Sequence, residues 1–598
     1  MIQNLWSVSV WFSLRYNKIS MVSCNQAVNS ENYADFIYRY GNTSLELIRQ
    51  QTGTNCISYV DEEYVILHAP LDQVLPITLA RYSYSSIPAL YTLLDSTNME
   101  QSGILPVMRQ PGLNTGGEGV LLGIIDTGID YRNPLFRNTD GTTRILGIWD
   151  QTATGSFSME SSRGASYEFL YGKEYRKEQI DEALASTDPL SLVPVTDDSG
   201  HGTFLAGIAA GGTEEDTDFT GAAPSCSLGI VKLHPAKQYL RDYYQIPASA
   251  TAYQSNDIMT AITYLRFLSY RHQMPLVICL SLGTNQGSHD GTSPLSQTLN
   301  HLNTLRGVCS VCSAGNEVGF RHHCSGVAAE DSSHYTEIEL RTGEGESGFQ
   351  LELWASFPEV YTIGLVSPTG QATGRIPYGS DNHTTIRFPL EQTDVTVSYL
   401  PASVTQNTNL VVLRFQTPAA GIWKIQVYPS RTLSGIFHLW LPAQGLVSPD
   451  TFFLNSDPST TITDPGNAAF PITAAACDHT NGSLYIHSSR GYTRDGRIKP
   501  DLAAPGVDVY GPGISSVPGD FPYTRMTGSS IAAAHVAGAA ACLYSWGYVK
   551  GNEPSINSRS IKAYLTLGAD RIAAYRYPNP EWGYGMLNLY QSFLAMRE

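Results

Sequence analysis

The sequence lacks any apolar stretch long enough to cross a bilayer, and it lacks the positive charge that attracts nucleic acid. A transmembrane helix needs about 18 or more consecutive apolar residues, and no run reaches that length. The 598 residues include 37 Lys and Arg against 54 Asp and Glu, for a formal charge of −17. This acidic excess disfavours binding to phosphate backbones and anionic lipid. We therefore expect no membrane span and no nucleic-acid partner.

A secretory leader is also not evident. Residues 1–20 contain a short apolar segment, but the charges of Arg15 and Lys18 follow it, whereas a signal peptide carries its positive charge first. A more ordinary sequence begins at Met21. We expect residues 1–20 to be an over-called start without a structural role.

Cysteine is too sparse for a disulfide-stabilised scaffold. The nine cysteines are an odd number scattered along the chain, whereas such scaffolds are short, dense and usually even. Cys279, Cys309 and Cys312 lie inside apolar runs, where a reduced cysteine behaves as a small hydrophobe. We expect reduced cysteines in an intracellular compartment.

Apolar strands alternate with helices before about residue 330 and again after about 460. The segment 257–273 predicts a helix with apolar residues at 258, 262, 265 and 268. Such alternation is typical of a parallel α/β sheet with helices on both faces. The predicted strands are 119–125, 227–233, 275–283 and 307–317.

Two other regions differ from this pattern. Residues 331–460 contain about eight short alternating segments with turn residues between them, which predicts an inserted all-β sandwich or jelly-roll-like module. Residues 21–95 predict a small α+β domain, with a helix over 33–49 and strands over 56–67 and 77–84.

Three polar residues stand at the ends of predicted elements. Asp126 ends a buried strand, His201 lies in a glycine-flanked turn before a helix, and Ser530 begins an alanine-rich helix. Singly, each is more simply a turn, structural or helix-capping residue. Together they supply the carboxylate, base and nucleophile of acyl transfer at the edge of an α/β sheet. The small residues around them, which permit close approach, favour the catalytic interpretation.

Asn316 follows another predicted strand and is a fourth candidate. Taken alone, it is most simply a turn residue. Its amide can donate a hydrogen bond to an oxyanion, and the Ser530 N–H at the start of a helix can supply a second donor.

The motifs DTGID, GHGT and GSSIAAAHVAG, with SLG and SAGN between them, resemble those of the subtilisin-like serine peptidases, the subtilases. The likeness covers about 100–325 and 465–598. It implies that Asp126 orients His201, and that His201 acts as general base and then general acid. It further implies that Ser530 is the nucleophile that forms an acyl-enzyme and that Asn316 stabilises the oxyanion.

The same resemblance implies how substrate binds. Ser281-Leu282-Gly283 would form the edge that pairs with an extended substrate backbone. Ala314 and Gly315 would lie near the pocket for the residue before the scissile bond.

The chain departs from the family pattern at several positions. Ser529 replaces the usual threonine before the nucleophile, and His535 corresponds to a helix histidine that is not catalytic. Four apolar replacements bear on pocket shape and remove no reacting group. They are Phe204, Leu205, Ile531 and Ala534, where the family usually has His, Val, Met and Pro.

The layout is similar to that of the clostridial spore-germination (Csp-type) subtilases. This narrower resemblance implies a prodomain that assists folding and is cleaved by the enzyme itself. It also implies a protein zymogen as substrate, the precursor of a spore cortex-lytic enzyme, in an intracellular or spore-associated location in a bacterium. The expected division is 1–20 extension, 21–95 prodomain, 96–330 first catalytic part, 331–460 β module and 461–598 second catalytic part.

The extended segment 87–95 is the candidate for self-cleavage, near Leu94 or Asp95. The alternative is that 87–99 is simply an interdomain linker. We expect no cofactor and assign no metal: His322-His323-Cys324 are adjacent ligands without a second cluster, and no Asp-rich loop indicates the structural calcium that many subtilases bind. Asp197-Asp198 predict a solvated loop or a local helper of His201.

Two functions are therefore carried forward. The first is an active serine endopeptidase that acts on its own prodomain and on a protein substrate. The second is a catalytically silent binding or regulatory protein whose β module is the partner surface. The complete set of Asp126, His201 and Ser530 favours the enzyme.

Overall fold

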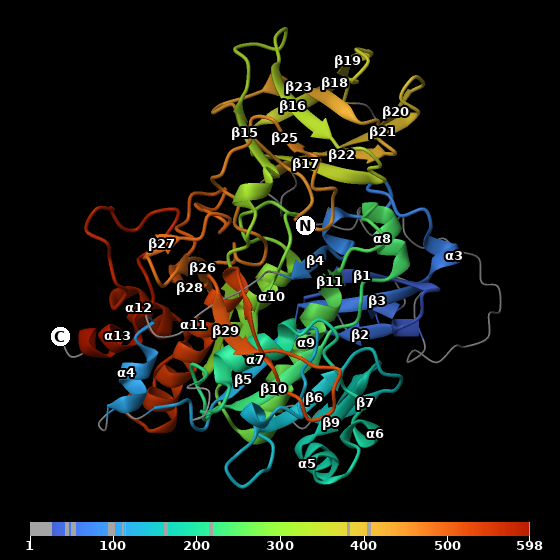
Figure 1. The fold of residues 1–598 in the computed structure, drawn as a ribbon. Helices are drawn as coiled ribbons and strands as arrows, with labels where there is room; N and C mark the ends of the chain where they lie inside the picture. Colours follow the sequence, from blue (N-terminus) through green and yellow to red (C-terminus); the bar gives the residue numbers. More distant parts are fainter. Residues whose placement is uncertain are drawn as a thin grey trace.

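The structure, a computed structural model, describes most of the chain outside its N-terminus. The described residues are 27–41, 43, 47–49, 56–61, 63–93, 102–110, 113, 115–160, 166–214, 219–378, 383–402 and 408–596. They form an N-terminal domain (27–93), an α/β body in two sequence segments, and a β module between these segments (Figure 1).

The α/β body is built on a nine-stranded sheet. Its order is β27-β26-β14-β12-β5-β10-β6-β9, with β28 also beside β26. The strands from β26 to β6 run parallel, and β27 and β9 are antiparallel edges. The parallel α/β prediction is confirmed. The strands are β5 (Leu121–Asp126), β6 (Ile145–Asp150), β9 (Lys173–Arg176), β10 (Ser227–Lys232), β12 (Leu276–Leu280), β14 (Val308–Ser313), β26 (Ile472–Asp478), β27 (Ser483–Leu484) and β28 (Leu502–Pro505).

Helices cover both faces of this sheet because each buried strand points alternate side chains into two cores. In β12, Val277 and Cys279 pack with α7 (His201–Ala210) and α11 (Ser529–Tyr544). Leu276, Ile278 and Leu280 of the same strand pack with α9 (Ser255–His272) and α10 (Pro294–Leu302) on the other face. The remaining longer helices are α4 (Ile104–Arg109), α5 (Lys177–Ala185), α8 (Gln238–Tyr244), α12 (Ser558–Leu567) and α13 (Leu589–Ala595).

The N-terminal domain corrects two predictions. The segment expected to be a helix over 33–49 begins with a strand, β1 (Tyr33–Arg39), which pairs with β3 (Tyr64–Pro70). Both faces of β1 are buried, so its apolar run has no clear alternation and was mistaken for a helix. The strand expected over 77–84 is absent, and a 3₁₀ turn, η1 (Tyr84–Ser86), follows that segment. The other elements are β2 (Ile57–Tyr59), α3 (Leu71–Val74) and β4 (Leu90–Leu93).

The cysteines also differ in part from expectation. Cys56 in the N-terminal domain is disulfide-bonded, so the expectation of reduced cysteines is wrong at this position. The free cysteines among the described residues are all buried, and burial raises the pKa of the Cys279 and Cys309 thiols to about 12. These thiols are therefore protonated packing residues.

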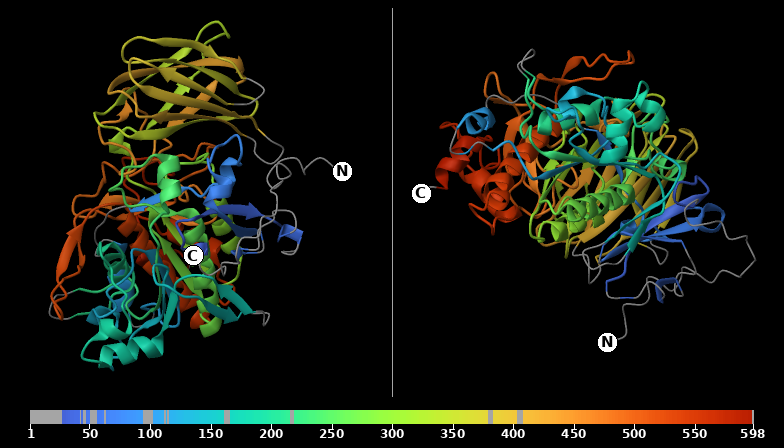
Figure 2. Two further views of the ribbon diagram at one scale, coloured as in Figure 1. Left: turned by 90° about the vertical axis from the view of Figure 1, so that its right-hand side faces the viewer. Right: turned by 90° about the horizontal axis from the view of Figure 1, so that it is seen from below.

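The β module is a sandwich of two antiparallel sheets around one apolar core (Figure 2). Their orders are β15-β24-β17-β22-β21-β20 and β19-β18-β23-β16-β25. The first strand, β15, precedes the expected start of the module at 331. The strands are β15 (His323–Val327), β16 (Thr336–Thr342), β17 (Gly348–Ser356), β18 (Val360–Val366), β19 (Ala372–Ile376), β20 (His383–Phe388), β21 (Thr393–Leu400), β22 (Thr408–Gln416), β23 (Gly421–Arg431), β24 (Ile436–Trp440) and β25 (Phe452–Phe453).

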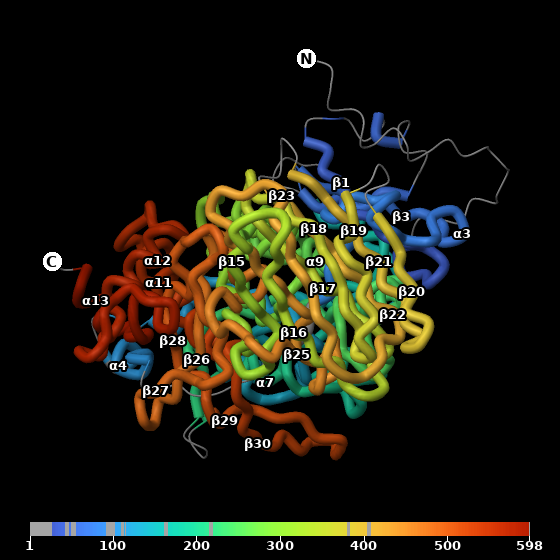
Figure 3. Tube along the Cα trace, turned by 90° about the horizontal axis from the view of Figure 1, so that it is seen from above, coloured from blue at the N-terminus to red at the C-terminus, as the bar shows by residue number. Residues whose placement is uncertain are grey.

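The module contacts both other parts of the molecule. Seen from above, it lies over the body, with α12 and α13 on one side and β1 and β3 on the other (Figure 3). The buried Glu352 carboxylate of β17 accepts a hydrogen bond from Tyr84 Oη of the N-terminal domain (2.8 Å) and one from the Gly287 N–H of the body (3.0 Å). Burial raises the pKa of Glu352. One carboxyl group thus joins all three parts.

Within the described ranges, none of the helices combines the length and the apolar character that a bilayer span requires.

Gly538 of α11 gives a test of this packing. A Cβ there would lie 2.3 Å from Ala222 Cβ and 2.8 Å from the Ala209 carbonyl oxygen. We expect Gly538→Ala to destabilise the protein by about 1–3 kcal/mol through overpacking, although alanine is intrinsically the better helix former. Thermal and denaturant unfolding would measure the change.

Ala563, on the exposed side of α12, is the matched control. There Ala563→Gly should cost about 1 kcal/mol, because propensity alone decides. A Gly538→Ala protein as stable as the parent would contradict the close approach of α11 to Ala222.

Candidate active site

Three neighbouring strands deliver the predicted polar residues to one edge of the sheet. Asp126 is the last residue of β5, Ser281 directly follows β12, and Asn316 follows β14. Because β14, β12 and β5 are adjacent and parallel, their carboxyl ends meet. The structure therefore brings together residues separated by up to about 190 positions in the sequence.

Asp126 and His201 form a direct hydrogen bond. Their Oδ1 and Nδ1 atoms are 2.8 Å apart, and both side chains are buried. A carboxylate only accepts hydrogen bonds, so Nδ1 carries the proton and Nε2 is left as the basic nitrogen. The backbone N–H of Thr127 donates to the same Oδ1 at 2.8 Å and holds the carboxylate in place.

The space around Gly202 shows why a glycine follows His201. A Cβ at this position would lie 2.2 Å from the carbonyl oxygen of Gly128. The first turn of α7 can therefore rest directly on the end of β5 only if this residue has no side chain. This close approach places His201, the first residue of α7, against Asp126.

The two adjacent serines have different hydrogen-bond partners. Ser529 Oγ accepts a bond from the Gly315 N–H at 3.0 Å, and the Ser529 N–H donates to Asn316 Oδ1 at 3.0 Å. Ser530 Oγ is buried and makes no hydrogen bond within the described part of the chain. The Ser530 carbonyl oxygen accepts from Ser281 Oγ at 3.1 Å. Ser529 thus anchors the helix, and only the Ser530 hydroxyl is uncommitted.

In the structure, the side chains of His201 and Ser530 are not hydrogen-bonded to each other. They lie at the same sheet edge, on α7 and α11, which pack against each other. In serine hydrolases this contact commonly tightens only when substrate is bound. The hydrogen bond between Asp126 and His201 is therefore already formed, whereas the one between His201 and Ser530 has yet to form.

Asn316 has the orientation that an oxyanion donor needs. Its Oδ1 faces the Ser529 N–H, so its NH₂ group points away from that bond and is available as a donor. The Ser530 N–H lies in the first turn of α11, where backbone donors have no partner within the helix. The two donors flank the position of the nucleophile.

The substrate-binding edge holds a segment of the chain itself. β4 lies between β13 (Leu282–Gly283) and β11 (Tyr253–Gln254) as the middle strand of a small antiparallel sheet. Leu93 pairs with Leu282, and Thr92 pairs with Gly283. The predicted edge therefore binds extended backbone, and the N-terminal domain occupies it.

The other residues singled out in the sequence lie beside Asn316 or in the core. Ala314 and Gly315 directly follow β14, next to Asn316, and stay predicted pocket residues. His535 is buried, donates from Nδ1 to the Ile531 carbonyl (2.8 Å), and burial lowers its pKa to about 3, so it is a neutral structural residue. The four replaced family positions are buried in the core between α7 and α11: Phe204, Leu205, Ile531 and Ala534.

The His322-His323-Cys324 group is engaged by protein partners. His322 Nδ1 lies 2.9 Å from Glu317 Oε2, and His323 Nε2 lies 3.0 Å from His438 Nδ1. Among the residues that the structure describes, no group of three or more His, Cys, Asp or Glu side chains is arranged to hold a metal ion.

Sequence reasoning did not separate Asp197 from Asp198. The Asp198 side chain is 85% exposed, whereas Asp197 is buried. The Asp197 carboxylate accepts hydrogen bonds from the hydroxyls of Thr127 (2.7 Å) and Thr203 (2.8 Å) and from the N–H groups of Gly200 (2.9 Å) and Thr203 (2.8 Å). It therefore ties the turn that carries His201 to the residue next to Asp126.

Comparison with known proteins identifies the family. The sequence profile of the subtilase family matches residues 117–381 and 451–585, which is more than half of the chain and includes all three candidate catalytic residues. The chain belongs to the subtilase family. The prediction of a subtilisin-like serine peptidase, a hydrolase, is thereby confirmed.

Individual subtilases are similar over most of this chain. The solved structure of the CspB protease of Clostridium perfringens superposes with a TM-score of 0.72 at 30% identity, covering 83% of this chain and 96% of that one. Pyrolysin from Pyrococcus furiosus is 23% identical over 547 residues, which cover 86% of this chain. The subtilisin-like protease SBT3.8 of Arabidopsis thaliana is 24% identical over 474 residues, or 71% of this chain. The chain spans only 28% of pyrolysin and 56% of SBT3.8.

Asn316 gives the first test of this subtilase site. Asn316→Ala should lower kcat on a peptide substrate by about 10²–10³-fold with little change in KM, the range known for this donor in other subtilases. Ser529→Ala is the control, because it removes a hydroxyl at the same helix end without removing an oxyanion donor. Equal losses in the two variants would contradict the assignment.

Asp197 gives the second test. Asp197→Asn removes an acceptor that holds the His201 turn, and we expect kcat to fall by about 10–100-fold through misplacement of the base, with KM little changed. Asp198→Asn, at the exposed neighbour, should leave kcat unchanged. Steady-state kinetics would show both effects. A rise in KM with kcat unchanged would argue against a positioning role for Asp197.

Proposed function

We propose that this protein is an active serine endopeptidase that cuts its own N-terminal domain and then a protein substrate. The observation that carries the proposal is the uncommitted Ser530 hydroxyl beside the Asp126–His201 pair. A complete site of this kind has no structural purpose that simpler residues would not serve as well. The strand of the N-terminal domain in the substrate-binding edge supplies the first peptide to be cut.

The reaction follows from the atoms in place. His201 Nε2 takes the proton of Ser530 Oγ as this oxygen attacks the peptide carbonyl carbon. Asn316 Nδ2 and the Ser530 N–H stabilise the oxyanion. His201 then gives the proton to the leaving amine, and the acyl-enzyme is hydrolysed by water that His201 activates in turn. Asp126 stays ionised and steadies the imidazolium.

The pairing register supports the position of the first cut. Leu93 is the last described residue in the groove, and its partner Leu282 adjoins Ser281, which contacts Ser530. The described part of this segment therefore ends one pairing position away from Ser281. The proposed cut near Leu94 or Asp95 lies just outside the described residues.

The substrate in trans is a further part of the proposal. Similarity to the CspB protease over 96% of that chain supports a Csp-type role, in which the peptidase converts the zymogen of a spore cortex-lytic enzyme in an intracellular or spore-associated location. A protein with an accessible extended segment fits the groove, because β11 and β13 recognise backbone on both sides.

Intact-mass measurement tests the central step. We expect the wild-type protein to appear as two pieces that separate near residue 95, and Ser530→Ala to stay whole. Ser529→Ala should still be cut, because its hydroxyl is engaged with Gly315. Cleavage should also be lost in Asp126→Ala and His201→Ala.

A folded wild-type protein that stays whole would instead support the silent binding protein. In that case the N-terminal strand would act as a permanent plug of the groove. Cleavage that persists in Ser530→Ala would mean that another nucleophile or a contaminating peptidase cuts the chain.

A further inference from the structure

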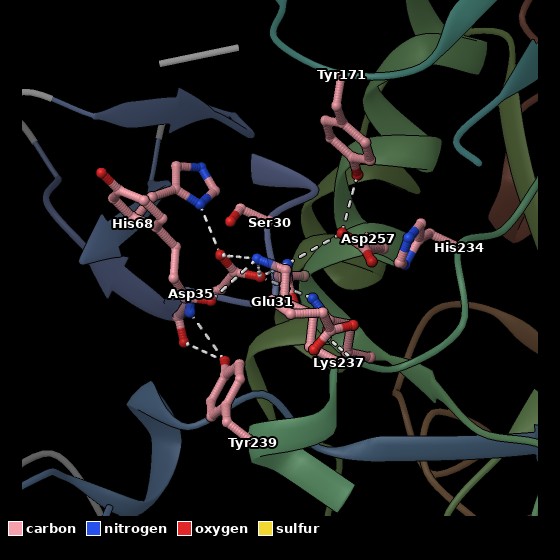
Figure 4. A network of polar contacts seen from close by, with 12 residues as sticks. Ser30, Glu31, Asp35, His68, Tyr171, His234, Lys237, Tyr239 and Asp257 are labelled. Atoms are coloured by element: carbon pink, nitrogen blue, oxygen red, sulfur yellow. Dashed lines mark hydrogen bonds and ion pairs between the residues drawn. The ribbon is translucent and has the colours of Figure 1, made fainter. Parts of the chain in front are cut away.

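The N-terminal domain is also fastened to the α/β body by a buried charged residue of β1, which lies next to β11 of the substrate groove (Figure 4). Asp35 of β1 is 1% exposed. Its carboxylate accepts hydrogen bonds from Lys237 Nζ (3.0 Å) and Gln254 Nε2 (2.8 Å) of the body. Within its own domain it accepts one from His68 Nδ1 (2.7 Å).

The body also forms hydrogen bonds with the backbone of Asp35. Tyr239 Oη accepts a hydrogen bond from the Asp35 N–H at 2.8 Å and donates one to the Asp35 carbonyl at 3.1 Å. Lys237 and Gln254 are the residues that precede α8 and α9, so both helix N-termini lie toward the carboxylate. We call the side chains of Lys237, Tyr239, Gln254 and Asn256 the Asp35 socket.

On the other side of Asp35, His68 continues into Ser58. Ser58 Oγ lies 2.7 Å from His68 Nε2, so the order Ser–His–Asp is that of a catalytic relay. All three side chains are at most 6% exposed, and Ser58 lies within a paired strand. This relay is therefore structural: it joins Ser58 to His68, and His68 Nδ1 donates to Asp35.

A second carboxyl group lies in the same buried network. Asp257 accepts a hydrogen bond from Tyr171 Oη at 2.9 Å and one from Asn256 Nδ2 at 3.1 Å, and the same amide nitrogen lies 3.5 Å from Asp35 Oδ2. Two buried carboxyls thus contact one amide nitrogen, that of Asn256, whereas the Lys237 ammonium bonds Asp35. Among the described contacts of Asp257, none is to a cationic side chain, so a charge on this second buried carboxyl is costly.

The proton belongs on Asp257. Burial, and then the charge of Asp35, raise the pKa of Asp257 to about 7 against the opposing effect of Lys237. Burial acts on Asp35 too, but Lys237 and His68 outweigh it and lower the pKa of Asp35 to about 2. The other titratable groups drawn around the pair in Figure 4 are Glu31, Tyr171, His234 and Tyr239.

The direction of the pH effect follows from these contacts. When the N-terminal domain moves away, Asp257 loses its negative neighbour Asp35, and this change lowers its pKa. Docking of the domain therefore takes up a proton. A group whose pKa is raised in the docked state stabilises docking below its undocked pKa, and that contribution is lost as the pH rises through about 7.

We propose that the Asp35 socket is a carboxylate-recognition site that holds the N-terminal domain in addition to the backbone pairing of the groove, and that its occupation places a proton on Asp257, so that the domain is held less tightly above neutral pH. The occupant is the Asp35-bearing strand β1 of the same chain. A strand that lacks a carboxylate at this position would not fit the site, because the Lys237 ammonium would then be buried without an anionic partner.

Hydrogen–deuterium exchange of the full-length Ser530→Ala protein tests the proposal without any need for peptidase activity. After correction for intrinsic rates, protection of 33–39 and 238–244 should fall by about tenfold between about pH 6 and about pH 8. Asp257→Asn mimics the protonated carboxyl, because its Oδ1 still accepts from Tyr171, and it should remove this pH dependence.

Asp35→Asn should lower protection of both segments at both pH values, and Lys237→Met should do the same from the body side if Asp35→Asn does not fold. Asp72→Asn, at an exposed aspartate of the same domain, is the matched control and should behave as the parent. Parent-like protection in both Asp35→Asn and Lys237→Met would overturn the socket. Equal pH dependence in the parent and Asp257→Asn would overturn the proton uptake.

Discussion

The parallel alignment of β5, β12 and β14 is the constraint on which the rest of the structure depends. It places Asp126, Ser281 and Asn316 at one edge, although they come from distant parts of the chain. The two helices then complete the site by local contacts: α7 brings His201 onto Asp126, and α11 is held where Ser281 donates to the Ser530 carbonyl and the Ser529 N–H donates to Asn316. The candidate catalytic residues and Asn316 all lie at the ends of these strands or on these two helices.

The N-terminal domain is attached to the body by two kinds of contact, which meet at Gln254. In the groove, β4 is held by backbone pairing, which any extended segment can make. At the socket, Asp35 is held by a buried ion pair and a set of side-chain donors that only a carboxylate satisfies. The β module adds a third tie through Tyr84 and Glu352. Release of the groove alone would therefore leave the domain attached.

The sequence indicated which polar residues meet at the sheet edge because their surroundings are local. Gly202 and the small residues near Ser530 are required by close approach, and such requirements are visible along the chain. The strand β1 was mistaken for a helix because burial on both faces removes its alternation. The sequence leaves Asp197 between a solvated loop and a helper of His201, because it does not separate this residue from Asp198. It gives no sign of the role of Asp35, whose partners lie about 200 residues away.

Phosphonate labelling followed by peptide mapping tests the central claim, that Ser530 and not its neighbour is the activated nucleophile. A small serine-directed phosphonate should add to Ser530 in the wild-type protein and in Ser529→Ala, and to nothing in Ser530→Ala. The label on Ser529, or a folded wild-type protein that takes up no label at all, would contradict the account.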